Sequence, residues 1–324
     1  MAHRHIFPDF FTNTYGGFMS NDNKKASNHF AYDDAFRTME AECDDIFIPF
    51  VNHVFEQNYT SKAIIKRKRN DHYIPNGNGG LAKKYTDSYV EIIEDGKEKR
   101  YHFECESKGY DKTLLVRFFQ YDSFIASDER IFKDKYNLTV RYPRSGLLVL
   151  RSNGNPPETA TITIETDGGN VTYPIKVIKV SDYSIEEIFD KHLFLLIPFY
   201  IFNYEKELKH YEKNEKVMES LAKKYESILD KLNDAHQRGL LSALSYGVII
   251  SMIERVITRL TNGKGSFQGK VGAIMGGKVL DLPEIRAYHQ GKDEGLAEGL
   301  AERKSLEDEV ERLRKELEEL KKKA

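Results

Sequence analysis

Hydrophobic residues recur at helical spacing near the start of this chain and alternate with polar residues after it. Apolar positions three or four residues apart predict a helix that begins near Tyr32 and that Pro49 breaks or kinks. The residues of this apolar stripe are Phe36, Met39, Cys43, Ile46, Phe47 and Phe50. Residues 85–93 and 101–108 then alternate as strands do, and the Asp-Gly pair at 95–96 between them is typical of a hairpin turn.

The next stretch continues the succession of helix and strand. A helix is predicted over about 112–127, and a short apolar strand over Leu147–Leu150. Residues 159–165 and 171–180 alternate on either side of a glycine-containing turn, which indicates a second hairpin. Read in order, the core is helix, strand, strand, helix and strand, with an added hairpin. The pattern therefore predicts an α/β (α+β) fold built on a mixed sheet.

Long amphipathic stretches dominate the second half of the chain and predict helices over about 184–259. Ser184 and Glu187 have the spacing of a capping box at the start of this region. At the other end of the chain, residues 1–30 are polar and are expected to be poorly ordered.

The last residues carry the apolar seam of a short coiled coil. Its a and d positions are Leu306, Val310, Leu313, Leu317 and Leu320. Residues 295–302 before it are interpreted as a linker. The seam either packs on its own domain or pairs with the same segment of another protomer, so a homodimer through residues 303–323 is one expectation.

Composition narrows the class of protein without naming a function. The 324 residues are enough to bury a full core, and a net charge of −2 places any attraction for nucleic acid in a local patch. The two cysteines, Cys43 and Cys105, fit neither a disulfide framework nor a zinc ribbon. Because the longest apolar run is too short to span a bilayer, the protein is expected to be cytoplasmic, without membrane contact.

The first predicted hairpin carries the residues with the clearest chemistry. Alternation places His102, Glu104 and Glu106 on one face of the second strand, and folding the hairpin back brings Asp87 near Glu104. Crowded carboxylates are costly unless a cation or water neutralises them, which is how proteins build a site for Mg²⁺ or Mn²⁺. The other interpretation is a pair of solvated carboxylates on an exposed sheet face.

Five sequence strings resemble a known family. Asp87, about seventeen residues and then Glu104-Cys105-Glu106 resemble the motif of the PD-(D/E)XK nuclease superfamily. Residues 101–107 followed by 114–122 are similar to the bacterial family of recombination-promoting nucleases and transposases, which commonly has Glu-Cys-Gln-Ser and then a helix with Arg-x-x-x-Tyr. The strings Tyr-Asp-Asp-Ala-Phe-Arg-Thr, Ile-Pro-Phe-Val-Asn-His-Val-Phe and Leu-Leu-Ile-Pro-Phe-Tyr at 32–38, 48–55 and 195–200 also match that family.

The resemblance implies a restriction-endonuclease-like core, and the periodicity described above adds a helical C-terminal region and the coiled-coil tail. The expected organisation is a poorly ordered segment at 1–30, a nuclease-like domain at 31–203, a helical region at 204–294, and the linker with the tail at 295–324. It also implies that the side chains of Asp87 and Glu104 bind the metal ion. The backbone carbonyl of Cys105, next in the strand, is a further candidate ligand.

Glu106 departs from the superfamily pattern, which usually has a lysine at this position. Glu106 either ligates the cation, acts as a general base, or marks a degenerate site that binds without cutting. Lys108 lies two residues further on and, in a regular strand, on the same face, where its ammonium could replace the missing one.

Other residues are candidates for supporting roles. The resemblance includes Asp33-x-x-Phe36-Arg37, in which Asp33 assists the site or caps the helix. Arg117 and Tyr121 share one helix face and either support the site or approach phosphate, or form an ordinary surface pair. His102 beside Glu104 is expected to support the site rather than bind a transition metal.

A run of basic residues is the best sequence candidate for contact with the DNA backbone, although such runs are more often solvated faces. The run consists of Lys66, Arg67, Lys68 and Arg69. The leading hypothesis is a Mg²⁺-dependent DNA endonuclease related to mobile elements and recombination. The alternative is a catalytically inactive nuclease-fold protein that binds DNA or a protein partner and oligomerises through its tail.

Overall fold

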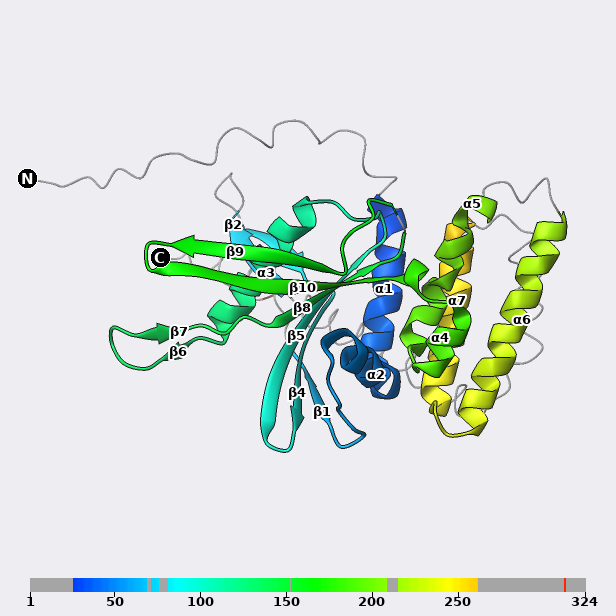
Figure 1. Cartoon of the computed structure of the whole chain (residues 1–324), viewed down its shortest axis with the longest axis horizontal. Helices are drawn as coiled ribbons and strands as arrows, with labels where there is room; N and C mark the ends of the chain where they lie inside the picture. Colours follow the sequence, from blue (N-terminus) through cyan, green and yellow to red (C-terminus); the bar gives the residue numbers. More distant parts are fainter. Residues whose placement is uncertain are drawn as a thin grey trace, which may run out of the picture.

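A mixed six-stranded sheet forms the centre of the protein (Figure 1). The computed structural model describes residues 26–68, 71–75, 81–151, 153–208, 215–261 and Arg312. In spatial order the sheet consists of β1 (Ile64–Arg67), β4 (Ser88–Glu94), β5 (Lys97–Glu106), β8 (Arg144–Val149), β10 (Gly169–Lys179) and β9 (Thr159–Thr166). Strands β5, β8 and β10 are parallel, whereas β1, β4 and β9 run antiparallel to their neighbours.

Two short hairpins stand beside this sheet. One pairs β2 (Asp71–Pro75) with β3 (Leu81–Tyr85), and the other pairs β6 (Ile131–Phe132) with β7 (Leu138–Thr139). The β6–β7 hairpin and the distal half of the β9–β10 hairpin project from the body of the molecule, on the left of Figure 1.

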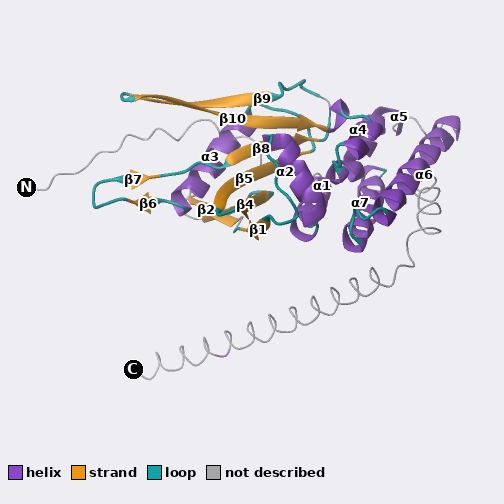
Figure 2. Ribbon diagram, turned by 60° about the horizontal axis from the view of Figure 1, so that its bottom comes forward, coloured by secondary structure: helices purple, strands orange, loops and turns teal. Residues whose placement is uncertain are grey.

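Helices cover both faces of the sheet (Figure 2). They are α1 (Ala26–Glu42), α2 (Asp44–Phe55), α3 (Thr113–Asp128), α4 (Ile185–Asp190), α5 (Glu205–Leu208), α6 (Glu215–Gln237) and α7 (Ala243–Leu260), with 3₁₀ segments η1 (Val180–Asp182) and η2 (Phe194–Tyr204). Tyr101 and Phe103 of β5 point toward α1 and α2 and belong to the larger buried cluster. Leu147 and Val149 of β8 point the other way and pack with Phe118 of α3.

The mixed α/β class predicted from the pattern is confirmed, together with both hairpins. In the first hairpin Ser88 pairs with Phe103, and Asp95 and Gly96 take positive φ values of 50° and 71° in the turn. In the second, Thr166 pairs with Gly169. This second hairpin is part of the main sheet rather than an addition to it, because β10 pairs in parallel with β8.

The first helical region differs from its prediction at both ends. Helix α1 begins at Ala26 rather than near Tyr32. The break falls at Cys43 between α1 and α2, whereas Pro49 lies inside α2. Pro49 is the sixth residue of α2, so the helix continues through it without the hydrogen bond that a backbone N–H at this position would donate to the carbonyl of Asp45.

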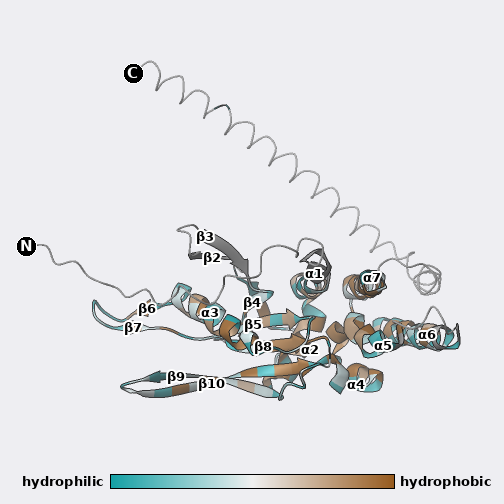
Figure 3. Ribbon diagram, turned by 90° about the horizontal axis from the view of Figure 1, so that it is seen from above, coloured by the Kyte–Doolittle hydropathy of each residue, from teal (hydrophilic) through white to brown (hydrophobic). Residues whose placement is uncertain are grey.

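The helical second half shares its core with the sheet. One buried cluster contains Phe103 of β5, Phe36 of α1, Leu196 of η2 and Ile253 of α7. Figure 3 shows hydrophobic residues concentrated where the sheet approaches these helices. The capping box at the start of α4 is confirmed: Ser184 accepts from the Glu187 N–H and Glu187 accepts from the Ser184 N–H. The domain limits expected from the sequence stay a prediction.

In the described ranges, no helix is both long enough and apolar enough to cross a membrane. The residues of the expected coiled-coil seam lie outside the described part of the chain, and so do residues 1–25.

Candidate active site

Asp87 and Glu104 lie together at one end of the sheet. Asp87 immediately precedes β4, opposite Glu104 in the antiparallel register with β5. Its N–H lies 3.4 Å from Glu104 Oε1, and its Oδ2 accepts a hydrogen bond of 2.8 Å from the Cys105 N–H. Both carboxylates are buried, at 6% and 3% exposure. The expectation of solvated carboxylates on an exposed face is therefore wrong.

Two arginines from opposite sides of the sheet reach these carboxylates. Arg37 of α1 lies 3.3 Å from Asp87 Oδ1. Arg117 of α3 lies 3.1 Å from Glu104 Oε2 and 3.6 Å from Glu106 Oε2. The site thus occupies the end of the sheet where α1 on one face and α3 on the other converge.

Asp33 belongs to the same cluster. It lies one helical turn before Arg37, and its Oδ1 is buried without a hydrogen-bond partner. Burial raises the pKa of Asp33 to about 7; the positive charge of Arg37 opposes this shift, and the negative charges of Glu106 and Glu104 add to it. Capping is wrong as a role for Asp33, because α1 begins seven residues earlier, at Ala26.

The cluster resists holding all of its negative charges at once. Burial raises the pKa of Asp87 well above its usual range, and the charges of Glu104 and Asp33 raise it further. The backbone N–H of Cys105 and the Arg37 guanidinium oppose this shift. A group that brought positive charge into the cluster would favour the ionised carboxylates.

Glu106 lies beside Glu104, as alternation along β5 predicts, since Arg117 contacts both. Lys108 is different. Strand β5 ends at Glu106, and the Lys108 N–H turns back to donate to Glu106 Oε1 at 2.7 Å. The strand alternation that was expected to place the Lys108 side chain on this face is therefore interrupted, and the side chain is exposed.

His102 connects Glu104 to a second buried carboxylate. Its Nε2 lies 3.1 Å from Glu104 Oε1 and its Nδ1 lies 2.7 Å from Asp122 Oδ1, which also accepts from Ser145 Oγ at 2.8 Å. All four residues are buried. Burial alone lowers the pKa of His102, but hydrogen bonds and charges from Asp122 and Glu104 outweigh it and raise the pKa to about 9. Both ring nitrogens face carboxylates, an arrangement that favours the protonated imidazole, and His102 lies where it can hold Glu104 in place. Its supporting role at a metal site stays a prediction.

Tyr121 and Arg117 face the same site from α3, so the expectation of an ordinary surface pair is wrong for their placement. Tyr121 is buried, its ring centroid is 6.0 Å from that of His102, and burial, with a contribution from the charge of Glu104, raises its pKa to about 12. The Cys105 thiol is buried on the face toward α1 and α2. The ligand role of the Cys105 carbonyl stays a prediction.

The basic run on β1 is already matched by acidic groups of the fold. Lys66 and Lys68 lie 3.5 Å and 2.9 Å from the two carboxylate oxygens of Glu91. Arg67 pairs with Glu40 and with Asp44. Arg69 lies outside the described residues. DNA contact by this run stays a prediction, and its three described cations already have partners within the protein.

The donor chemistry fits a divalent cation, although the described side chains are arranged around arginines. Carboxylate oxygens of Asp87 and Glu104 are the hard ligands that Mg²⁺ prefers, and the unpartnered Oδ1 of Asp33 lies in the same cluster. Among the described residues no group of three or more His, Cys, Asp or Glu side chains has the spacing of a metal site. The Arg37 and Arg117 guanidinium groups lie against the carboxylates instead.

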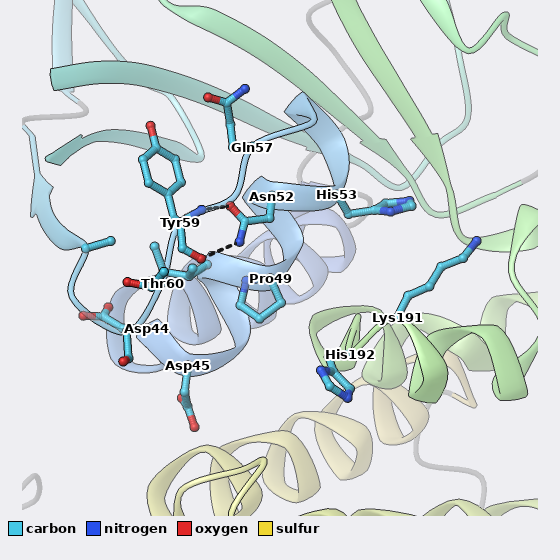
Figure 4. A pocket seen from close by; sticks show the side chains of 13 residues that line it. Asp44, Asp45, Pro49, Asn52, His53, Gln57, Tyr59, Thr60, Lys191 and His192 are labelled. Carbon is cyan, nitrogen blue, oxygen red and sulfur yellow. Dashed lines mark hydrogen bonds between the residues drawn. The ribbon is translucent and has the colours of Figure 1, made fainter. Parts of the chain in front are cut away.

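A cavity of about 770 Å³ lies elsewhere, between α2 and the end of α4 (Figure 4). Asn52 on its wall exchanges two hydrogen bonds of 2.9 Å with the backbone of Tyr59, and Lys191 and His192 form the opposite side. None of the predicted site residues lines it. We place the candidate chemistry at the carboxylates of Asp87 and Glu104 because both are buried and crowded together, whereas this cavity is lined mainly by partly or fully exposed side chains.

Comparisons with protein-family models, with curated proteins and with solved structures find no match for this chain. Sequence reasoning assigned no role to Arg37, Asp122 or Ser145. Asp122 had a detectable signal, because it lies on the apolar face of a predicted helix, four residues after Phe118 and three before Ile125. A carboxylate at such a position requires a buried partner.

Proposed function

We propose that the protein is a metal-dependent nuclease that hydrolyses phosphodiester bonds of DNA. The observation that carries this proposal is one cluster between two arginines in which Asp87 and Glu104 are buried and the half-buried Asp33 has a buried, unpartnered Oδ1. Helix α1, the antiparallel strands β4 and β5, helix α3 and the parallel strand β8 follow the order helix, strand, strand, helix, strand that the resemblance implies for the core. This order supports the proposal.

Each residue of the cluster has a distinct role in the proposed reaction. Asp87 and Glu104 would hold Mg²⁺ or Mn²⁺, which when bound supplies charge neutralisation at the phosphate and activation of a water. His102 orients Glu104 through the contact of its Nε2 with Glu104 Oε1. Arg37 and Arg117 add positive charge beside the carboxylates, which favours the approach of an anionic phosphate. Glu106 is the group at hand to accept a proton.

A second function, DNA binding without cleavage, is favoured by one specific observation. Glu106 occupies the position of the superfamily lysine, and the side chain that approaches it is Arg117 rather than a lysine. An arginine held by two carboxylates remains protonated and cannot serve as an acid or base at neutral pH. Such a site could bind the cation and the phosphate but lack the group that activates water.

Plasmid nicking separates the two functions. Wild-type protein with Mg²⁺ or Mn²⁺ is expected to convert supercoiled plasmid to open circles, and Asp87→Ala and Glu104→Ala to lose at least about a hundredfold of that rate. Asp45→Ala is a matched control, since Asp45 caps α7 through Ser242 and Ser245 and lies outside the cluster. Equal nicking by all variants would assign the activity to a contaminant or to another site.

Thermal unfolding reports cation binding independently of cleavage. Mg²⁺ is expected to raise the melting temperature of wild type by about 2–4 °C, and to have no effect on Asp87→Ala. A Mg²⁺ shift without nicking over a range of metals and substrates would favour the non-cleaving function. The absence of both would overturn the proposed site.

A further inference from the structure

The β6–β7 hairpin extends away from the body of the protein with little packing of its own (Figures 1 and 2). We define the arm as residues 130–141, which follow α3 directly. Every residue of the arm is exposed except the half-buried Thr139, and none belongs to either buried cluster. Phe132 and Tyr136 are 66% and 86% exposed. Leaving large side chains in water in this way is typical of a binding surface.

The arm carries a net positive charge, whereas the net charge of the whole chain is slightly negative. Its four basic residues, Arg130, Lys133, Lys135 and Arg141, face one acidic residue, Asp134, which gives a net charge of +3 against −2 for the whole chain. Asp134 is used within the turn, where it accepts from the N–H of Tyr136 and from the side chain of Asn137.

These cations are not neutralised by the fold. Within the described ranges Lys133, Lys135 and Arg141 make no ion pair, in contrast to Lys66, Arg67 and Lys68 of the basic run on β1. Two of the arm's cations lie over its own aromatic rings: Arg130 is 5.9 Å from the Phe132 centroid and Lys135 is 5.6 Å from the Tyr136 centroid. Cations and aromatic side chains are thus interleaved along the ribbon.

This combination fits nucleic acid better than protein. Lysine is depleted from the cores of protein interfaces, and a second copy of the arm would bring the same positive charge face to face. Phosphates along a duplex complement that charge, and the major groove of B-DNA is wide enough to admit a two-stranded ribbon.

The arm is also joined to the candidate active site by a rigid element. Helix α3 carries Arg117 and Tyr121 at the carboxylates and leads into the arm at Arg130. The seven steps of helical rise from Tyr121 to the end of α3 at Asp128 span about 11 Å, and Arg130 follows two residues later. That distance is less than one turn of duplex, about 34 Å, so a single DNA molecule can contact both.

We propose that the β6–β7 arm is a DNA-binding arm that inserts into the groove of duplex DNA and holds it across the carboxylate cluster. This inference rests on the proposed function, because it names the substrate form and the surface that binds it.

The test compares the affinity of full-length variants for a short fluorescent duplex, measured by anisotropy in EDTA over a series of salt concentrations. Lys133→Gln/Lys135→Gln is expected to lose about tenfold or more in affinity, and its plot of log affinity against log salt should be shallower by about two. The matched control is Lys216→Gln/Lys223→Gln on α6, which removes the same charge at the opposite end of the molecule (Figure 1) and should change the affinity less than about twofold.

The possible outcomes distinguish failure of the arm proposal from failure of the proposed nuclease activity. Equal losses in both double variants, or a wild type that does not bind duplex DNA, would overturn the arm proposal. A wild type that prefers single strands would overturn it as well, since stacking on Phe132 and Tyr136 would then explain binding. If the arm variant binds weakly while wild type nicks no plasmid with any metal, the arm is supported and the proposed cleavage fails. If the arm variant binds and nicks as wild type does, cleavage stands and the arm proposal fails.

Discussion

Individual side chains at the end of β5 set the charge state of the candidate site. Glu104 has three polar neighbours that act on it: His102 from its own strand, Arg117 from α3 and the N–H of Asp87. His102 is in turn tied to Asp122. His102, Glu104 and Asp122 are buried, so a positive charge on the imidazole would stabilise the negative charge of carboxylates that water does not reach.

Stability is expected to depend on pH through His102. Its pKa in the folded protein, about 9, lies above its ordinary value of 6.5. The contribution of the protonated His102 to the stability of the folded protein is therefore fully present below about pH 6.5 and is lost as pH rises through 9. Relative to His102→Gln, wild type should lose on the order of 1–3 kcal/mol of unfolding free energy over that range, as measured by urea denaturation. His192→Asn, at an exposed histidine, is the control and should follow wild type. Parallel pH profiles for wild type and His102→Gln would contradict a protonated bridge.

At the scale of elements, the parallel pair β5–β8 depends on a glycine. Gly146 pairs with Phe103, whose ring is packed against Phe36, Phe47, Phe50 and Phe55 at centroid distances of 5.2–6.3 Å. A Cβ atom at Gly146 would lie 2.7 Å and 2.9 Å from atoms of the Phe103 ring and 3.3 Å from Phe55. A ring held on so many sides has little room to move.

Gly146→Ala is therefore expected to destabilise the protein by about 1–3 kcal/mol through overpacking. Urea unfolding measures the loss. Gly168→Ala in the β9–β10 turn is the control, because its added Cβ would be 3.8 Å from Thr166 Oγ1, an ordinary contact, and its φ is not in the left-handed region. Equal stabilities of the two variants would show that Phe103 can repack.

At the scale of the whole molecule, the sheet and the helical second half share one interior. Ile249, Ile253 and Val256 of α7 are buried in the same cluster as Tyr101 and Phe103 of β5. Segments that bury a common apolar surface lose it together when either unfolds.

Unfolding is accordingly expected to be a single transition over the described body of the protein. Far-UV circular dichroism reports mainly the helices and tyrosine fluorescence reports both halves, since the chain has 19 Tyr and no Trp. Both signals should give the same unfolding midpoint. Ile253→Ala should lower the free energy of unfolding obtained from each signal by about 2–5 kcal/mol, as is typical of such a truncation. Two separate midpoints would indicate independent domains.

The expected coiled coil at residues 303–323 is tested by the oligomeric state of the protein. Sizing the full chain against a chain truncated after Ala301 tests it, and a monomer in both cases across micromolar concentrations would exclude the tail as a dimerisation element.

The sequence alone determined the local features whose causes are local. Alternation placed Glu104 and Glu106 on one face of β5, the Asp-Gly pair marked the turn that brings Asp87 back to Glu104, and Ser184 with Glu187 marked the start of α4. Each of these depends on residues close together in the chain, where strand period and turn geometry leave few alternatives.

Only the tertiary structure decided which groups meet across elements. Arg37 reaches Asp87 from α1, and Asp122 reaches His102 from α3. Glu91 and Glu40 pair with cations of the basic run, which the sequence offered only as a candidate for DNA contact. Conversely, the cations of the β6–β7 arm remain in water because that hairpin does not fold back onto the sheet. Whether a charge is paired or free depends on contacts between residues distant in the chain, and such contacts leave no periodic signal in the sequence, because only the packing of helices on the sheet brings those residues together.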